Sequence, residues 1–165
     1  MSGKIKISIS ESSLNIVSAH EFVADPAHGA VDSFVGAVRD KNMGRDVLGV
    51  SYDVFESLAV KTLQKMCEDI RDEYDGKINI YISHFKGRLD VGGISVIIAV
   101  STPHRAESFS ACRKLIEELK HQAPIWKQEH YTDGDSEWVQ GHALCQHAQE
   151  HSHEDEHKHK KHAHG

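Results

Sequence analysis

The sequence predicts an α+β fold with a mostly antiparallel sheet. Several short segments alternate apolar and polar residues with the two-residue period of strands, whereas three other segments have the helical period. These segments follow one another in a mixed order and do not form a regular strand–helix alternation. At 165 residues, the chain is long enough for one domain with a buried core.

The first half of the chain is predicted to contain three strands and two helices. In order, we expect a strand at residues 4–9, a helix at 15–24, a strand at 30–38, a polar loop at 40–44, a strand at 47–55 and a helix at 56–74. The second helix has Leu63, Cys67 and Ile70 on one face and charged residues on the opposite face. The turn residues Asp75 and Gly76 are expected to end it.

The second half is predicted to continue the sheet and to add one more helix. In order, we expect a strand at 78–84, a hairpin connection at 87–93, a strand at 94–100, a helix from Thr102 to about Gln122, a strand at 125–131 and a turn at 133–135. Residues 94–100 are almost all apolar, which indicates a central strand covered on both faces. Thr102 is predicted to cap the helix, with Pro103 as its first residue, and Pro124 is predicted to end it.

The composition excludes several classes of protein. The formal net charge is −6, so the chain lacks the basic face that non-specific nucleic-acid binding requires. There is no recognisable signal peptide, and no apolar segment approaches the roughly 20 residues that cross a bilayer. The three cysteines form no CxxC motif and are too few for a disulfide framework. We therefore expect a protein of the reducing cytoplasm.

The C-terminal segment differs from the rest of the chain. Residues 142–165 hold eight of the 14 histidines, interleaved with three lysines and four acidic residues, which leaves residues 1–141 at a charge of −5. We expect residues 1–141 to form the domain and residues 142–165 to be a disordered tail. The tail either remains solvated or binds Zn²⁺ or Ni²⁺ without fixed geometry. Its candidate ligands are His147, His151, His153, His157 and His159.

Five cations dispersed through the sequence are candidates for one anion-binding site. Arg39 follows an apolar strand, His104 and Arg105 lie in the predicted first turn of a helix, and Lys120 and Lys127 flank its predicted end. Backbone N–H groups at a helix N-terminus are unpaired and favour an anion, and a guanidinium binds phosphate or carboxylate with two hydrogen bonds. The alternative is that these residues pair with acidic groups at the surface.

The two lysines are also candidates for catalysis. Two amines in one pocket lower each other's pKa, so that one of them can act as a base or nucleophile. The alternative is a pair of solvated lysines. Cys67 and Cys112 lie on apolar helix faces, where cysteine acts as a small hydrophobe. If sulfur chemistry occurs, we expect the sulfur to arrive on a partner. His84, in a predicted strand, is interpreted as structural, as is His130.

Taken together, these motifs resemble the large, catalytic subunit of molybdopterin synthase over about residues 4–140. The segments that carry the resemblance are FVGAVRD at 34–40 with Asn42 and Gly44, GRLDVG at 87–92, His104-Arg105 with Phe109, Ala111 and Cys112, LK at 119–120, APIWK at 123–127, and Gly134 through Trp138. The sequence departs from the family at Gly93, where an acidic residue is usual, and at Asp53, where glutamate is usual. The resemblance implies an α/β hammerhead fold with an additional small antiparallel sheet.

The resemblance also implies an activity and partners. The enzyme would be a sulfurtransferase that converts cyclic pyranopterin monophosphate (precursor Z) to molybdopterin, without a cofactor. Its sulfur would come from the C-terminal glycine thiocarboxylate of a small ubiquitin-like subunit. In this family the large subunit forms a homodimer with one small subunit at each end, a heterotetramer.

By motif position, the resemblance implies roles for six residues. Lys127 would be the essential catalytic lysine and Lys120 an assisting one. Arg39, His104 and Arg105 would bind the substrate phosphate, and Phe34 would line the site. One alternative is a non-catalytic scaffold for a ubiquitin-like partner, although a scaffold needs neither lysine. The other is a metal-binding protein that acts through the histidine-rich tail.

Overall fold

The computed structural model describes residues 2–141, which fold into two sheets and three helices. The helices are α1 (Ile16–Val23), α2 (Glu56–Glu73) and α3 (Arg105–Gln122). The strands are β1 (Ile5–Ser10), β2 (Ala30–Ala37), β3 (Lys41–Asn42), β4 (Arg45–Val54), β5 (Asn79–Phe85), β6 (Gly87–Asp90), β7 (Ile94–Thr102), β8 (Ile125–Tyr131), β9 (Gly134–Asp135) and β10 (Val139–Gln140). The predicted α+β class is confirmed.

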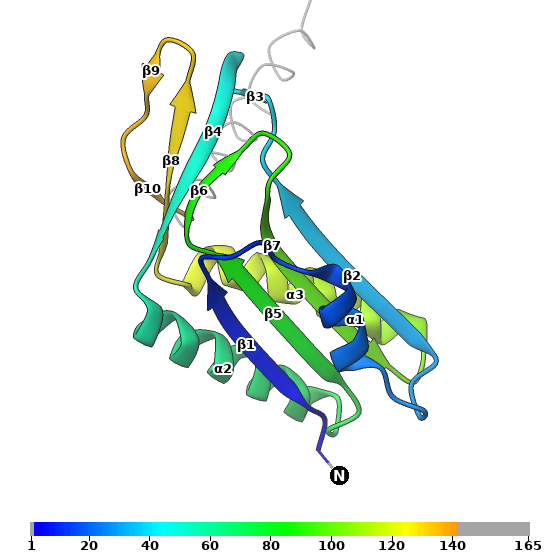
Figure 1. The fold of residues 1–165 in the computed structure, drawn as a ribbon. Coiled ribbons are helices and arrows are strands. Elements are labelled where there is room, and N and C mark those ends of the chain that lie inside the picture. Colours follow the sequence, from blue (N-terminus) through cyan, green and yellow to red (C-terminus); the bar gives the residue numbers. More distant parts are fainter. Residues whose placement is uncertain (1, 142–165) are drawn as a thin grey trace, which may run out of the picture.

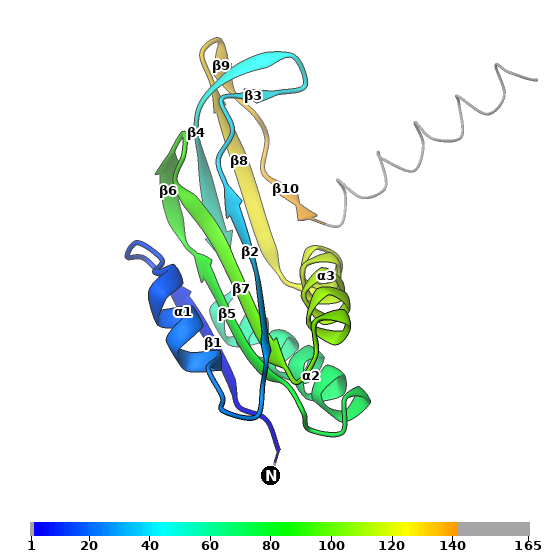
Figure 2. The ribbon, with the colours of Figure 1, turned by 90° about the vertical axis from the view of Figure 1, so that its right-hand side faces the viewer.

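The first sheet lies between two layers of helix. Its strand order is β1-β5-β7-β2, and only the β1–β5 pair is parallel. Helix α1 covers one face, while α2 and α3 cover the other (Figures 1 and 2). Because successive residues of a strand face opposite sides, Ile98 packs toward α2 and α3, and Ile97 packs toward α1. The prediction that residues 94–100 form a central strand covered on both faces is confirmed.

The second sheet is antiparallel throughout and extends beyond one end of the first sheet (Figure 1). Its order is β10-β8-β4-β3, with β6 paired to β4 and β9 paired to β8. The predicted hairpin connection at 87–93 is confirmed, because it joins the antiparallel pair β5 and β7, but the segment also contains β6, which pairs with β4 and was not predicted. At Gly49 the two strands come so close that a Cβ atom would lie 2.5 Å from the Leu89 carbonyl oxygen. Only glycine fits this position.

Helix α3 begins later than predicted. Pairing between β2 and β7 continues to Ala30 and Thr102, so Thr102 is the last residue of a strand and is not a helix cap. Its hydroxyl donates a hydrogen bond of 2.6 Å to the carbonyl of His104. His104 has an extended backbone and is the N-cap residue, which makes Arg105 the first residue of the helix. Pairing with a distant strand therefore decides this boundary.

The two cysteines of the described residues are inert core side chains. Cys67 and Cys112 are 0% and 4% exposed and belong to the cluster that joins α2 and α3 to the sheet. Burial disfavours the charged thiolate and raises the pKa of both thiols to about 12. Neither side chain is a nucleophile at neutral pH.

We predict that iodoacetamide at pH 8 leaves Cys67 and Cys112 unmodified in the native protein, because both thiols are protonated and buried. Both should be alkylated after unfolding in guanidinium chloride. Peptide mass spectrometry measures the two positions separately, and the unfolded sample is the control for reagent activity. Alkylation of either residue in the native state would contradict this packing.

Candidate functional site

The structure brings the two predicted lysines into one cavity. Helix α3 ends at Gln122, and Pro124 directs the chain into β8, so that Lys127 turns back toward Lys120. Both side chains line the cavity together with Tyr52 and His84, and we call it the lysine pocket. Its remaining wall is mostly apolar and comes from Leu119, Ala123, Ile125, Val139 and Gly141. The cavity lies where the first sheet, the second sheet and the end of α3 meet.

A second cavity adjoins the first and contains Arg39. Arg39 follows β2 and lines this cavity, the arginine pocket, together with Asn42 and Glu129. Tyr52 and Lys127 line both cavities. This sharing follows from strand pairing, because Tyr52 on β4 lies directly opposite Lys127 on β8. The structure therefore places Arg39 and Lys127 in the lining of one cavity.

Glu129 is a member of the site that the sequence analysis missed. It lies two residues after Lys127 on β8, so both side chains point to the same face of the sheet. The Lys127 Nζ to Glu129 Oε1 distance is 3.2 Å, and Glu129 is only 8% exposed. A buried carboxylate needs such a partner. The sequence did contain a signal for this ion pair, because two residues of opposite charge stand at i and i+2 on a predicted strand.

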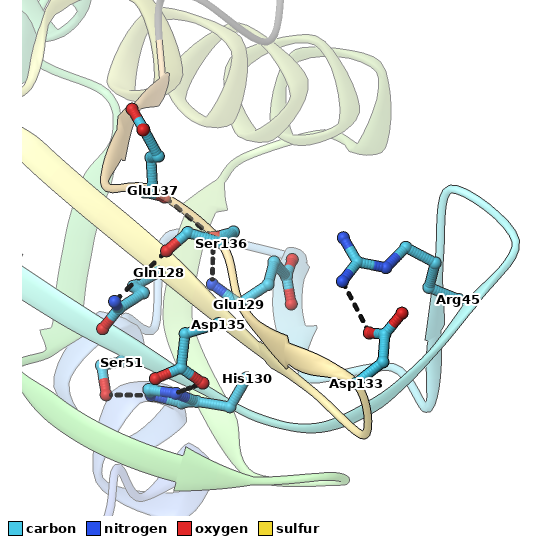
Figure 3. A network of polar contacts seen from close by, with 9 residues as sticks. All are labelled: Arg45, Ser51, Gln128, Glu129, His130, Asp133, Asp135, Ser136 and Glu137. Atoms are coloured by element: carbon cyan, nitrogen blue, oxygen red, sulfur yellow. Dashed lines mark hydrogen bonds and ion pairs between the residues drawn. The ribbon is translucent and has the colours of Figure 1, made fainter.

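A hydrogen-bond network on the neighbouring hairpin holds β8 in place (Figure 3). The Glu129 backbone N–H donates to Ser136 Oγ over 2.8 Å, and the Ser136 backbone N–H donates to the Glu129 carbonyl over 2.9 Å. His130 bonds Asp135 through Nδ1 and Ser51 through Nε2, at 2.9 and 2.6 Å. Alternation along the strands puts Ser51 and His130 on the face opposite Tyr52 and Lys127. We therefore assign this network to positioning β8, which agrees with the structural interpretation of His130.

His84 has a position that the sequence did not predict. It lies near the end of β5, is 4% exposed and packs edge-on against the Tyr52 ring, with 5.2 Å between ring centroids. Burial, with the charge of Lys120 nearby, lowers the pKa of His84 to about 4, although a bond to the backbone of Phe85 opposes this shift. The ring is therefore neutral at pH 7, inside a pocket that contains two amines.

The other predicted cations lie elsewhere in the chain. His104 and Arg105 are exposed at the start of α3, whereas Lys120 lies in its last turn. Arg105 and Lys120 are separated by about 22 Å along the helix, at a rise of about 1.5 Å per residue. Within one chain, His104 and Arg105 therefore lie far from the lysine pocket. Phe34 lies on β2, 36% exposed, and lines neither pocket within residues 2–141.

The described residues contain neither a metal-binding cluster nor a membrane-spanning helix. Within residues 2–141, no three side chains of His, Cys, Asp or Glu cluster as a metal-binding group. The candidate ligands His147, His151, His153, His157 and His159 lie outside this range, as does the rest of the predicted tail. In the part of the chain that the structure describes, no helix has both the length and the apolar character needed to span a membrane.

Comparison with known proteins gives consistent matches. The family described as MoaE protein matches residues 9–122. A molybdopterin synthase catalytic subunit of Synechococcus elongatus is 45% identical over 141 residues, 86% of each chain. One from Nostoc is 42% identical over 126 residues, 76% of each chain. The crystal structure of molybdopterin synthase from Staphylococcus aureus superposes with a TM-score of 0.75 at 31% identity, over 79% of this chain and 94% of that one.

We predict that acid destabilises the protein partly through His84. In the unfolded chain this histidine has an ordinary pKa near 6.5, whereas burial holds the pKa near 4 in the folded state. Between these values the unfolded state binds the extra proton, so stability falls as the pH falls. From pH 6.5 to 5, the free energy of unfolding should decrease by about 1.5 kcal/mol more in the wild type than in His84→Gln. Urea unfolding at both pH values measures this difference, and identical pH dependence of the two proteins would contradict it.

Proposed function

Because the chain belongs to the MoaE family of molybdopterin synthase catalytic subunits, we propose that it transfers sulfur to a cyclic pyranopterin monophosphate. The family makes the chain an enzyme of molybdopterin synthesis, and a catalytic subunit implies a further subunit. The observation that carries the proposed chemistry is the convergence of Lys120 and Lys127 in one pocket that adjoins Arg39.

The charges of the two pockets suit an anionic substrate and an anionic sulfur donor. Arg39 can bind the substrate phosphate with two hydrogen bonds, and the lysine ammonium groups can hold a second anion nearby. Cys67 and Cys112 are buried in the core and their thiols are protonated, so neither supplies the sulfur. We infer that the sulfur enters as the C-terminal thiocarboxylate of a small ubiquitin-like subunit. No cofactor is needed for this transfer.

The proposed transfer uses the lysines to bind charge and to move protons. The thiocarboxylate sulfur attacks a carbon of the pterin side chain that bears an oxygen of the cyclic phosphate. The carbon–sulfur bond forms as that carbon–oxygen bond breaks, so the phosphate ring opens, the displaced oxygen stays on the pterin as part of the phosphate, and a thioester links the two molecules. Water then adds to the acyl carbon, the acyl–sulfur bond breaks, and the sulfur stays on the pterin while the carrier leaves as a carboxylate. Lys127 would hold the acyl oxygen and move the proton of the attacking water. Alternatively, its amine would take the acyl group, the sulfur would leave on the pterin, and water would later have to cleave the resulting amide to release the carrier. Lys120 would assist by neutralising charge.

The pockets of one chain are too small for this reaction alone. Their volumes are about 40 and 60 Å³, whereas ligand sites usually enclose roughly 300–1,000 Å³. We infer that other chains complete the walls. The tail of the small subunit would form one side of the lysine pocket, and its glycine terminus would reach Lys127.

We further infer that a second copy of this chain contributes His104 and Arg105, because its own α3 holds them about 22 Å from Lys120. The outer strand β2 and the start of α3 expose apolar side chains, Val31, Phe34, Val35 and Phe109, at 50%, 36%, 41% and 59%. An edge strand with exposed apolar residues favours association with another chain. A twofold dimer would use this surface, and a small subunit at each end would give a heterotetramer, which we place in the cytoplasm.

We predict that Lys127→Ala abolishes formation of the dithiolene group of molybdopterin. The rate should fall at least about 100-fold, because the transition state loses its cation and proton carrier. The assay combines the full chain, precursor Z and the thiocarboxylated small subunit, and molybdopterin is the product scored. Lys61→Ala, on the exposed face of α2, is the matched control and should retain full activity. Both variants should still bind the small subunit. Full turnover by Lys127→Ala would refute the assigned role, and a stable complex with an inactive wild type would favour the scaffold alternative.

We predict that two inactive variants restore activity when they are mixed. If each site combines Lys127 of one copy with Arg105 of the other, hybrid dimers of Lys127→Ala and Arg105→Ala contain one intact site. After subunit exchange, an equal mixture should reach about a quarter of wild-type activity, while each variant alone stays inactive. The mixture of Lys127→Ala with Lys120→Ala is the control, since both changes lie in one pocket of one chain. Activity no greater than that of the separate variants would exclude the shared site.

A further inference from the structure

We propose that His84 is a substrate-contacting residue of the lysine pocket, whose Nε2 accepts a hydrogen bond from an N–H or O–H group of the pterin. This inference rests on the proposed function and extends it to an uncharged residue beside Arg39, Lys120 and Lys127. It assigns to the pocket a neutral acceptor beside two ammonium groups. Three features of the structure support it.

The first feature is the tautomer of the ring. His84 Nδ1 lies 2.8 Å from the backbone carbonyl oxygen of Phe85. A carbonyl oxygen can only accept a hydrogen bond, so Nδ1 carries the proton. In a neutral imidazole, the other nitrogen then has a free lone pair. The backbone of β5 thereby presets Nε2 as an acceptor.

The second feature is where Nε2 lies. None of the hydrogen bonds within residues 2–141 involves this atom, and the same part of the chain contains no side-chain N or O that is both fully buried and unpartnered. Nε2 must therefore reach an open surface. His84 is 4% exposed and lines the lysine pocket, so we assign the open surface at Nε2 to that cavity.

The third feature is the surroundings of the ring, which keep it uncharged. Lys120 faces it from α3, Lys127 from β8 and Tyr52 from β4. Burial, together with the charge of Lys120, disfavours an imidazolium and lowers the pKa of His84 to about 4. The pterin ring system carries N–H donors as well as its phosphate. The lysines and Arg39 would hold the anionic groups of the substrate. His84 would accept a hydrogen bond from the edge of the pterin ring that carries the N–H donors.

Two substitutions separate a substrate contact from a structural role. The amide of Gln reaches the position of Nε2 and can place an acceptor oxygen there, but it cannot replace the bond from Nδ1 to Phe85. The amide of Asn lies at the position of Nδ1 and can donate to the Phe85 carbonyl, but it offers nothing at Nε2. A substrate contact predicts that His84→Gln is the more active variant, whereas a purely structural role predicts that His84→Asn is.

The test is steady-state kinetics of the full chain with the thiocarboxylated small subunit, at varied precursor Z. We expect His84→Gln to stay within about threefold of the wild-type KM, and His84→Asn to raise KM at least about tenfold with a smaller change in kcat. Thermal unfolding of both variants is measured beside the kinetics, to confirm that they are folded at the assay temperature. Equal KM values for His84→Asn and the wild type, or a higher KM for Gln than for Asn, would overturn the inference.

A second measurement distinguishes this inference from the proposed function itself. Nitrogen-15 NMR of the labelled full chain should show His84 as a neutral ring with protonated Nδ1 at pH 7, with the signal assigned by its loss in His84→Asn. Adding precursor Z should shift the Nε2 resonance. An inactive wild type would overturn the proposed function and this inference with it. An active wild type whose Nε2 resonance does not respond to precursor Z would overturn the inference alone.

Discussion

The turn from α3 into β8 is the constraint on which the candidate site depends. At Ala123 the backbone leaves the helix and becomes extended, and Pro124 prevents the helix from continuing. The Pro124 carbonyl accepts a hydrogen bond from the Phe55 backbone N–H, which ties this turn to the junction between β4 and α2. The pairing of Ile125 with Val54 begins there and aligns Lys127 with Tyr52. A straight helix would separate the lysines from the arginine pocket.

The positive charge of the site is partly compensated by a buried carboxylate. Lys127 lies between two cavities and has a buried counter-ion, Glu129, on its own strand. This ion pair lets an amine remain close to Arg39 without leaving the region strongly positive when no substrate is bound. A substrate anion would then compete with Glu129 for Lys127. His84 adds an acceptor without adding charge, which two nearby cations make favourable.

The sequence predicted elements whose signals are local and missed features that depend on distant pairing. Helix α2 and the central strand β7 follow from periodicity and apolar content, and both were predicted within a few residues. The start of α3 was not, because pairing with β2 extends the strand to Thr102. The strand at 87–90 was read as a connection, since its partner β4 lies more than 30 residues earlier in the chain.

The same distinction applies to the site. Lys120 and Lys127 flank a proline that is visible in the sequence, so their proximity could be predicted from local chemistry. Tyr52 and His84 reach the pocket only through the register of β4 with β8 and the position of β5, which no local pattern records. His104 and Arg105 were grouped with the lysines by motif, although α3 holds the two sets at opposite ends. In the proposed dimer, the motifs would group residues that meet only between two copies of the chain.

The proposed chemistry places a further demand on this architecture. A dithiolene contains two sulfur atoms, whereas one thiocarboxylate delivers one, so a spent carrier must leave before the second transfer. A fully enclosed site on one chain would have to open for each carrier. Here Lys120 is exposed and Lys127 is only partly buried. Arg39 lines the adjoining arginine pocket. In the proposed function, the pterin would stay bound through its phosphate at Arg39 and its donor groups at His84, while carrier tails exchange at the exposed side of Lys120. Two cavities that share Lys127 would thus allow two successive transfers on one bound substrate.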